Sequence, residues 1–262
     1  MRPVVLVIAL VAACRWNFDA VGTDGGPGGP DATDAPAGHD EDGDGVPDST
    51  DTCPHVDGDQ ADRDGDGVGD LCDPAPDTAG EQLVLFDPMI TGSGFEVVSA
   101  SWEDAGDAYR CDASTEFCEI KRSLVFDRGI VEIGVDVVVH VDTAPQHQIS
   151  ISLFDTPLDP YDYVEVYETG TSAGYAAVTS FDGTTYLPLT MQAMTSGIHT
   201  GRLRLQYAVT APTPTVGVTA RWSPEVYETS VPIANHAAGS FVAISAQELV
   251  VELAYIAAIA AP

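Results

Sequence analysis

Residues 131–141 read VEIGVDVVVHV, with valine or isoleucine at every odd position. The even positions include Glu132, Asp136 and His140. A period of two places alternate side chains on opposite faces of a β-strand, so one face of this stretch packs on a core and the other meets polar surroundings. The stretch therefore predicts a half-buried strand of an antiparallel sheet.

The same alternation recurs through the part of the chain that follows residue 82. It appears in the ranges 149–153, 203–207, 216–222 and 249–255, with Gly, Pro and Asp between them. No segment shows a long helical period. The final 14 residues are apolar, but they contain Glu252 and are shorter than the roughly 20 residues that cross a bilayer, so we expect a last core strand. Residues 82–262 are thus predicted to form an antiparallel β-sandwich.

The order of these features resembles the concanavalin A-like jelly-roll superfamily. An early stretch from Phe95 to Trp102 comes first and is followed by a hairpin. The alternating strands and the segment Tyr161 to Tyr167 come next, and Gly239-Ser240-Phe241 stands just before the last strand. The resemblance implies carbohydrate binding as the commonest role and, in some relatives, glycoside hydrolysis. Another β-sandwich family is the alternative to the jelly-roll superfamily.

Two tyrosines are the candidate ligand contacts. Tyr161 and Tyr163 alternate with Asp162 and precede Glu165. Aromatic faces stack on sugar rings, and nearby carboxylates accept hydrogen bonds from hydroxyl groups, so this segment is the predicted glycan surface. The alternative is that the tyrosines pack across neighbouring strands.

The sequence offers weak support for catalysis. Hydrolases of the jelly-roll superfamily carry a Glu-x-Asp-x-Glu strand, and this chain lacks that pattern. Glu132 and Asp136 share a face, but Gly134 stands between them. The string from Gly170 to Gly174 matches Gly-x-Ser-x-Gly without the strand-to-helix turn that a nucleophile elbow requires. We predict a non-catalytic binding protein and keep a calcium-dependent glycoside hydrolase and a passive structural envelope protein as alternatives.

The overall charge limits the partners. The chain has 41 Asp and Glu against 10 Lys and Arg, a net charge of −31. Nucleic acids and anionic membrane surfaces are negative themselves, so we expect neither as a direct partner. Multivalent cations are the natural counter-charge.

Residues 40–73 contain two similar aspartate-rich loops, 22 residues apart. Positions 1, 3, 5, 6, 9 and 12 of the first loop are Asp40, Asp42, Asp44, Gly45, Asp48 and Asp51. The same positions of the second loop are Asp62, Asp64, Asp66, Gly67, Asp70 and Asp73. Calcium takes six to eight oxygen ligands from such a loop, where a glycine at position 6 makes the sharp turn and position 7 offers its carbonyl. We expect these carbonyls from Val46 and Val68.

This segment cannot fold on a hydrophobic core. It has 13 acidic residues against Arg63, a net charge of −12. Two carboxylates about 4 Å apart repel by roughly 4 kcal/mol at an effective dielectric constant near 20, so the loops need bound cations to order. An acidic disordered spacer is the alternative.

Together with Cys53-Pro54, Gln60 and Cys72, the two loops resemble the thrombospondin type 3 repeat. The resemblance covers residues 40–73. It implies calcium bound by both loops, a metal-centred unit with little regular secondary structure, and a disulfide between the neighbouring loops. Residues 74–81 then form a linker to the predicted sandwich.

The amino terminus carries an export signal. Residues 1–13 have Arg2 as their only charge and an apolar run too short to span a membrane. The string Val11-Ala12-Ala13-Cys14 resembles a bacterial lipobox, which implies lipidation at Cys14 and delivery to the outer membrane. Residues 14–39 are rich in Gly and Pro and predict a disordered tether. The membrane is thus expected to be a partner only through the lipid anchor.

Four cysteines remain after Cys14. An even number in an oxidising compartment favours two disulfides, and four cysteines allow three pairings. We favour Cys53 with Cys72 and Cys111 with Cys118, because each pair lies within one local unit.

Overall fold

A computed structural model describes residues 38–91, 94–99, 102–113, 117–140, 146–155, 160–169, 174–210, 214–233 and 239–262. The predicted signal segment, Cys14 and residues 14–37 of the predicted tether lie outside the described residues. So does the Gly170-Thr171-Ser172-Ala173 part of the Gly-x-Ser-x-Gly string.

The described elements are almost all strands. They are η1 (Asp48–Thr50), a short 3-10 helix, and the strands β1 (Gln82–Asp87), β2 (Glu96–Ser99), β3 (Trp102–Asp104), β4 (Tyr109–Asp112), β5 (Phe117–Phe126), β6 (Gly129–His140), β7 (Gln146–Phe154), β8 (Tyr161–Thr169), β9 (Tyr175–Phe181), β10 (Tyr186–Ala193), β11 (Gly201–Thr210), β12 (Thr215–Trp222), β13 (Glu225–Pro232), β14 (Gly239–Gln247) and β15 (Leu249–Ala260). Within the described residues, no helix is long and apolar enough to cross a bilayer.

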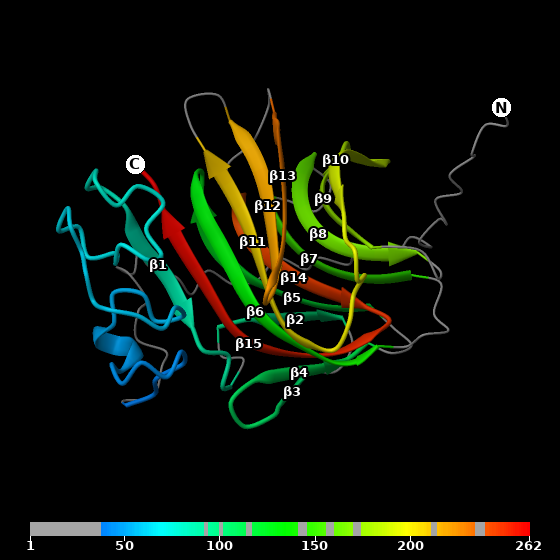
Figure 1. Cartoon of the computed structure of the whole chain (residues 1–262). Coiled ribbons are helices and arrows are strands. Elements are labelled where there is room, and N and C mark those ends of the chain that lie inside the picture. The colour runs from blue at the N-terminus through cyan, green and yellow to red at the C-terminus, as the bar shows by residue number, and fades with distance from the viewer. Residues whose placement is uncertain are drawn as a thin grey trace, which may run out of the picture.

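The strands form two antiparallel sheets that pack face to face (Figure 1). The eight-stranded sheet has the order β13-β12-β11-β6-β15-β4-β3, and β1 also pairs with β15. The seven-stranded sheet has the order β10-β9-β8-β7-β14-β5-β2. Strands that are neighbours in a sheet are often distant in the chain, as with β6 and β15 or β7 and β14. This confirms the predicted antiparallel jelly-roll sandwich.

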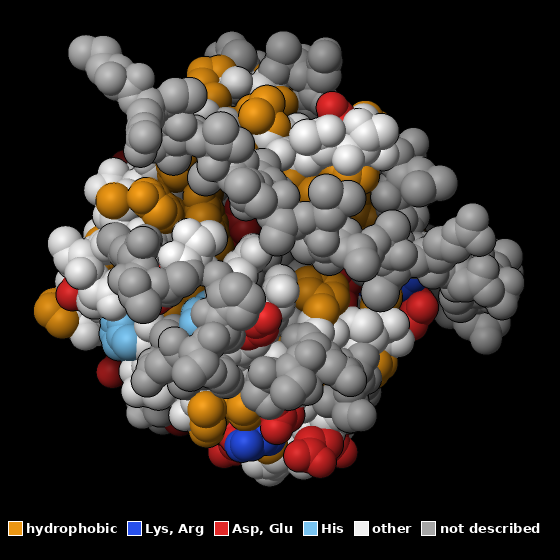
Figure 2. All heavy atoms as spheres, turned by 90° about the vertical axis from the view of Figure 1, so that its right-hand side faces the viewer, with side chains coloured by type: hydrophobic (Ala, Val, Ile, Leu, Met, Phe, Trp, Pro, Cys, Tyr) orange, Lys and Arg blue, Asp and Glu red, His pale blue; other side chains and the backbone are white. Residues whose placement is uncertain are grey.

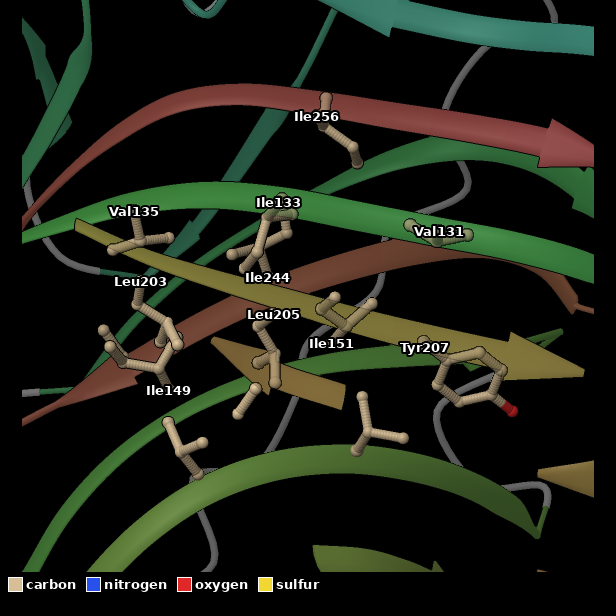
Figure 3. Close-up of a cluster of buried hydrophobic side chains, with 14 of the residues drawn as sticks. Val131, Ile133, Val135, Ile149, Ile151, Leu203, Leu205, Tyr207, Ile244 and Ile256 are labelled. Atoms are coloured by element: carbon tan, nitrogen blue, oxygen red, sulfur yellow. The ribbon is translucent and has the colours of Figure 1, made fainter. Parts of the chain in front are cut away.

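The odd-numbered residues at the start of the stretch 131–141 face the core, as the alternation predicts. Val131, Ile133 and Val135 are at most 2% exposed. They meet side chains of β11 from the same sheet and side chains of β7 and β14 from the opposite sheet (Figure 3). The hydrophobic effect of this shared interior therefore holds the two sheets together.

The apolar C-terminal run is the strand β15, which pairs with β6 along most of its length. Its buried residues are shared between the sandwich core and a smaller cluster on the outer face of the eight-stranded sheet. The prediction of a core strand, in preference to a membrane anchor, is confirmed.

Residues 40–73, called here the repeat, lie against the outer face of the eight-stranded sheet, beside β1 and β15 (Figure 1). The His55 ring lies 5.4 Å from the Tyr255 ring, and Arg202 lies 3.6 Å from Glu41. Few apolar side chains of the repeat are fully buried; Cys53 and Val68 are among them. The repeat therefore depends on polar contacts and on the surface beneath it.

Two disulfides connect Cys53 with Cys72 and Cys111 with Cys118. The first closes the repeat across its two loops, and the second joins β4 to β5 and so ties one sheet to the other. Both pairings agree with the local pairing expected from the sequence.

Candidate functional site

The first aspartate-rich loop folds around its own position 1. Asp40 accepts hydrogen bonds from the backbone nitrogens of Gly43 and Gly45, both at 2.9 Å. Gly43 and Gly45 have φ values of +79° and +94°, which suit glycine. These turns bring carboxylate oxygens of Asp40, Asp42 and Asp44 within 4.8 Å of one another.

The second loop repeats this geometry. Asp62 accepts hydrogen bonds from the backbone nitrogens of Gly65 at 2.7 Å and Gly67 at 3.0 Å. Its carboxylate cluster has a different membership, because Asp64 and Asp66 are joined by Asp73 and by Glu81 within 4.8 Å. Glu81 immediately precedes β1 and lies outside the loop spacing, so the motif could not indicate it.

Several carboxylate oxygens in these loops are buried without a hydrogen-bond partner. They are Asp42 Oδ2, Asp51 Oδ2, Asp64 Oδ2, Asp73 Oδ2 and Glu81 Oε2. A buried carboxylate oxygen without a partner is costly, and a hard cation that takes several oxygens satisfies it. The donor set therefore fits calcium.

Burial raises the pKa of Asp42 to about 6. A hydrogen bond from the Asp44 backbone lowers this pKa, and the nearby carboxylates of Asp51, Asp44 and Asp40 raise it. Burial is thus the main cause of the raised pKa of Asp42, and repulsion between neighbouring carboxylates adds to it.

Position 9 of each loop accepts hydrogen bonds from the loop's own backbone. Asp48 accepts a hydrogen bond from the Glu41 backbone nitrogen and pairs with His39, and Asp70 accepts from the Arg63 backbone nitrogen. In both loops the position-9 carboxylate thus closes the loop by binding the backbone of position 2. Neither belongs to a carboxylate cluster.

The remaining predicted ligands form hydrogen bonds within the repeat. Asp51 is 8% exposed and accepts a hydrogen bond from Gln60, which also donates to Asp44. Gln60 therefore links positions 5 and 12 of the first loop. The backbone nitrogens of Val46 and Val68 donate hydrogen bonds to the position-5 carboxylates of Asp44 and Asp66. Val68 is 1% exposed.

The predicted ligand tyrosines lie on the outer face of the seven-stranded sheet. Their neighbour Val164 faces the sandwich core, so Tyr161 and Tyr163 point the other way. They belong to a group of aromatic rings in contact, called here the aromatic platform: Phe154, Tyr161, Tyr163, Phe181, Tyr186 and Phe241. Tyr186 is 43% exposed, whereas Tyr163 is 9% exposed and mainly packs against its neighbours. Hydrophobic side chains reach the surface on the side opposite the repeat (Figure 2).

A row of polar residues crosses the same face. The strand registers place Glu119, Ser245, Ser150 and Glu165 opposite one another on β5, β14, β7 and β8. The two serine hydroxyls are 2.7 Å apart, and Thr179 donates to Glu165 at 2.6 Å. All four residues of this polar row are at most 8% exposed, so little of the row meets solvent.

Both carboxylates of the polar row hold their protons more tightly than usual. Burial raises the pKa of Glu119 to about 8, with Lys121 opposing the shift. Burial also raises the pKa of Glu165 to about 7, against the hydrogen bond from Thr179. The sequence pattern indicates Glu165 as a carboxylate near the candidate tyrosines, but it does not indicate Glu119, because the two glutamates are brought into one row by pairing between distant strands.

Glu132 and Asp136 each form an ion pair with an arginine, on the face that the repeat covers. Glu132 is 2% exposed and accepts from Arg204 and from the Tyr255 hydroxyl, each at 2.7 Å. Asp136 is bound by two nitrogens of Arg202, both at 2.9 Å. Both carboxylates thus have a structural partner.

No family model matches this chain, and no curated protein is similar to it in sequence. Among solved structures, it is similar to the CBM2 module of the evolved Dit of Lactobacillus casei BL23 phage J-1, with a TM-score of 0.54 and 9% identity over 68% of this chain and 95% of that one. This similarity agrees with the two-sheet β-sandwich described above. Winged bean acidic lectin (TM-score 0.49, 8% identity, 70% and 99% coverage) and Bacillus licheniformis β-glucanase (TM-score 0.46, 8% identity, 69% and 98% coverage) are less similar in structure.

Proposed function

We propose that this chain is an exported calcium-binding protein whose β-sandwich binds a glycan without catalysis. The observation that carries the glycan proposal is the aromatic platform beside the buried polar row on one face of the seven-stranded sheet. The calcium proposal rests on the buried, unpartnered carboxylate oxygens of the two loops.

Calcium binding is tested by titrating the chelator-stripped protein. We expect binding at both loops with a dissociation constant on the order of 10⁻⁴ to 10⁻³ M, as in other extracellular modules. Asp42→Asn and Asp64→Asn should each remove or weaken one class of site, whereas Asp59→Asn, at an exposed position outside the clusters, should change nothing. Absence of calcium binding at roughly ten times these concentrations would contradict the proposal.

The glycan proposal follows from the chemistry of the face. Aromatic rings stack on the apolar faces of sugar rings, and a few well-placed polar groups then fix orientation. Tyr186 is the most exposed ring of the aromatic platform and lies 4.6 Å from Phe181, centroid to centroid. The polar row supplies hydroxyl and carboxylate oxygens that bind sugar hydroxyls.

Binding is tested on a glycan array, followed by titration with the best ligand. Tyr186→Ala should weaken binding about tenfold, equivalent to ~1.4 kcal/mol, and Tyr186→Phe should retain most of it because the ring remains. Tyr109→Ala, which removes a tyrosine from the other sheet, is the matched control. Equal affinity of the wild type and Tyr186→Ala would remove the aromatic platform from consideration.

Glycoside hydrolysis is the second candidate, because Glu119 and Glu165 have the raised pKa values of general acids. Against it, Gln148, Ser150 and Ser152, which alternate with the core-facing residues of the central strand β7, carry no carboxylate. Release of reducing sugar from the bound glycan, abolished in Glu119→Gln or Glu165→Gln, would favour hydrolysis. Binding without turnover supports the first proposal.

The location proposal is export and anchoring to the outer membrane through a lipid on Cys14. Its support is the lipobox-like sequence, and the two disulfides agree with an oxidising compartment. Cys14→Ser should move the protein from the membrane fraction to the soluble fraction. Unchanged membrane association of this variant would contradict the anchor.

A further inference from the structure

We infer that the metal of the second loop is held jointly by the repeat and the sandwich through Glu81, and that this metal fastens the repeat to the outer face of the eight-stranded sheet. The inference rests on the proposed calcium binding by the repeat. It adds a ligand from outside the loop motif and assigns the metal a role between the two parts of the chain.

The sandwich fixes the position of Glu81. The next residue, Gln82, begins β1 and pairs with Ala260 of the last strand. The preceding residue, Gly80, has a φ of +145°, and a Cβ atom there would lie 3.1 Å from Pro262. Glu81 therefore directly precedes β1 and lies beside the end of the last strand, so its position depends on the sandwich.

The side chain of Glu81 points into the second carboxylate cluster. It is 4% exposed, its Oε2 atom has no hydrogen-bond partner, and it lies within 4.8 Å of oxygens from Asp64, Asp66 and Asp73. The Asp66 carboxylate also accepts hydrogen bonds from the backbone nitrogens of Gly80 at 2.9 Å and Glu81 at 2.8 Å. The loop thus already reaches the start of β1 through its backbone.

Charge makes this contact dependent on a cation. Four carboxylates from two parts of the chain converge, and no Lys or Arg in the described part of the chain forms an ion pair with any of them. Without a cation they repel one another, and the repulsion pushes the repeat away from β1. With calcium, the same four groups become ligands of one ion and draw the two parts together.

The rest of the contact between the repeat and the sheet is not closely packed throughout. A cavity of about 290 Å³ lies between them, lined by His55, Leu71 and Asp73 of the repeat and by Glu132 and Arg204 of the sheet, among others. Asp73 belongs to both the cavity wall and the carboxylate cluster. A tie at Asp73 and Glu81 therefore holds one wall of this cavity in place.

The experiment compares wild type, Glu81→Gln and the control Glu103→Gln, at an exposed position of β3, as mature full-length protein. Calcium titration should show the second-loop site weakened at least about tenfold in Glu81→Gln, since even indirect partners of metal ligands cost 10–100-fold, while the first-loop site is unchanged. Hydrogen exchange in residues 55–73 should be faster in Glu81→Gln at a calcium concentration that protects the wild type and the control.

Three results are decisive. If the wild type binds no calcium, the proposed calcium function itself fails, and the inference fails with it. If the wild type binds calcium at both loops and Glu81→Gln matches it in affinity and exchange, the inference alone is overturned. Should Glu81→Gln not fold, as judged by near-ultraviolet circular dichroism, Glu81→Asp replaces it: a shorter ligand should weaken the second site, and unchanged affinity would overturn the inference.

Discussion

At the residue scale, the burial of Glu132 shows how position alone changes a side chain's role. In the sequence it is an outward-facing strand residue. In the structure the repeat covers it, and Tyr255 reaches it by lying across Gly134, where an added Cβ would be 2.2 Å from the ring. The glycine that stands between Glu132 and Asp136 thus makes room for Tyr255.

His55 lies over this group as a neutral side chain. It is 8% exposed and packs against Tyr255 and Phe86, and its Nε2 atom lies 3.9 Å from Glu132. Burial lowers its pKa from 6.5 to about 4, although Glu132 opposes this shift and Arg204 adds to it. Protonation is therefore harder in the folded than in the unfolded state.

This sets a pH dependence. As the pH falls below 6.5, the unfolded state takes up the His55 proton first, so folding stability decreases between pH 6.5 and 4 by up to roughly 3 kcal/mol and is constant above that window with respect to this group. His55→Gln should lack this part of the slope, and His199→Gln should retain it. Urea unfolding at pH 5 and 7.5 in saturating calcium measures the difference. Identical slopes in all three proteins would refute the assignment.

At the element scale, the tight backbone turns of the two aspartate-rich loops depend on their glycines. Gly67 has a φ of +99° and nothing within 4 Å of an added Cβ, so a side chain there meets backbone strain and no clash. Gly106, in the turn between β3 and β4, has a φ of +94° and equally open surroundings. Substituting each glycine therefore compares backbone strain inside a predicted metal loop with equal strain in a turn outside it.

Gly67→Ala should weaken calcium binding at the second loop about tenfold, because the left-handed backbone costs an alanine roughly 1–2 kcal/mol and relaxation displaces the carboxylates. Gly106→Ala carries similar strain and should leave calcium affinity unchanged. Calcium titration of both variants provides the measurement. Equal loss of affinity in the two would show that the loop geometry is not responsible.

Other elements show the limits of sequence patterns. The alternation identifies β6, β7, β11, β12 and β15, but β5 is obscured. Arg122 has the same alternation as the core-facing Ile120 and Leu124, and it pairs with the buried Asp87 of β1. The edge strand β10 is largely exposed and has no clear apolar face. A strand whose inward position carries a charge, or which lacks a buried face, gives no signal of period two.

At the scale of the whole molecule, the two parts of the chain are stabilised by different forces. The sandwich has an extensive hydrophobic core between its sheets. The repeat has a disulfide, loop hydrogen bonds and unpartnered carboxylate oxygens. Their responses to loss of calcium should therefore differ.

Chelation should make residues 40–73 sensitive to proteases while the sandwich remains folded. Bound calcium at 100 times its dissociation constant stabilises a site by ~2.7 kcal/mol, which is large for a unit without a core. Limited proteolysis with mass spectrometry, with and without chelator, identifies the cut sites, and near-ultraviolet circular dichroism follows the sandwich. Equal protection of the repeat in both conditions would show that it orders without metal.

The sequence by itself determined the alternating strands, the local disulfide pairs and the two loops, because each depends on residues close together in the chain. Only the tertiary structure decided that Glu81 joins the second cluster, that Glu119 and Glu165 lie in one row, and that Glu132 is buried. Each of these depends on strand pairing or on packing of the repeat against the sheet, which brings together residues whose separation in sequence carries no pattern.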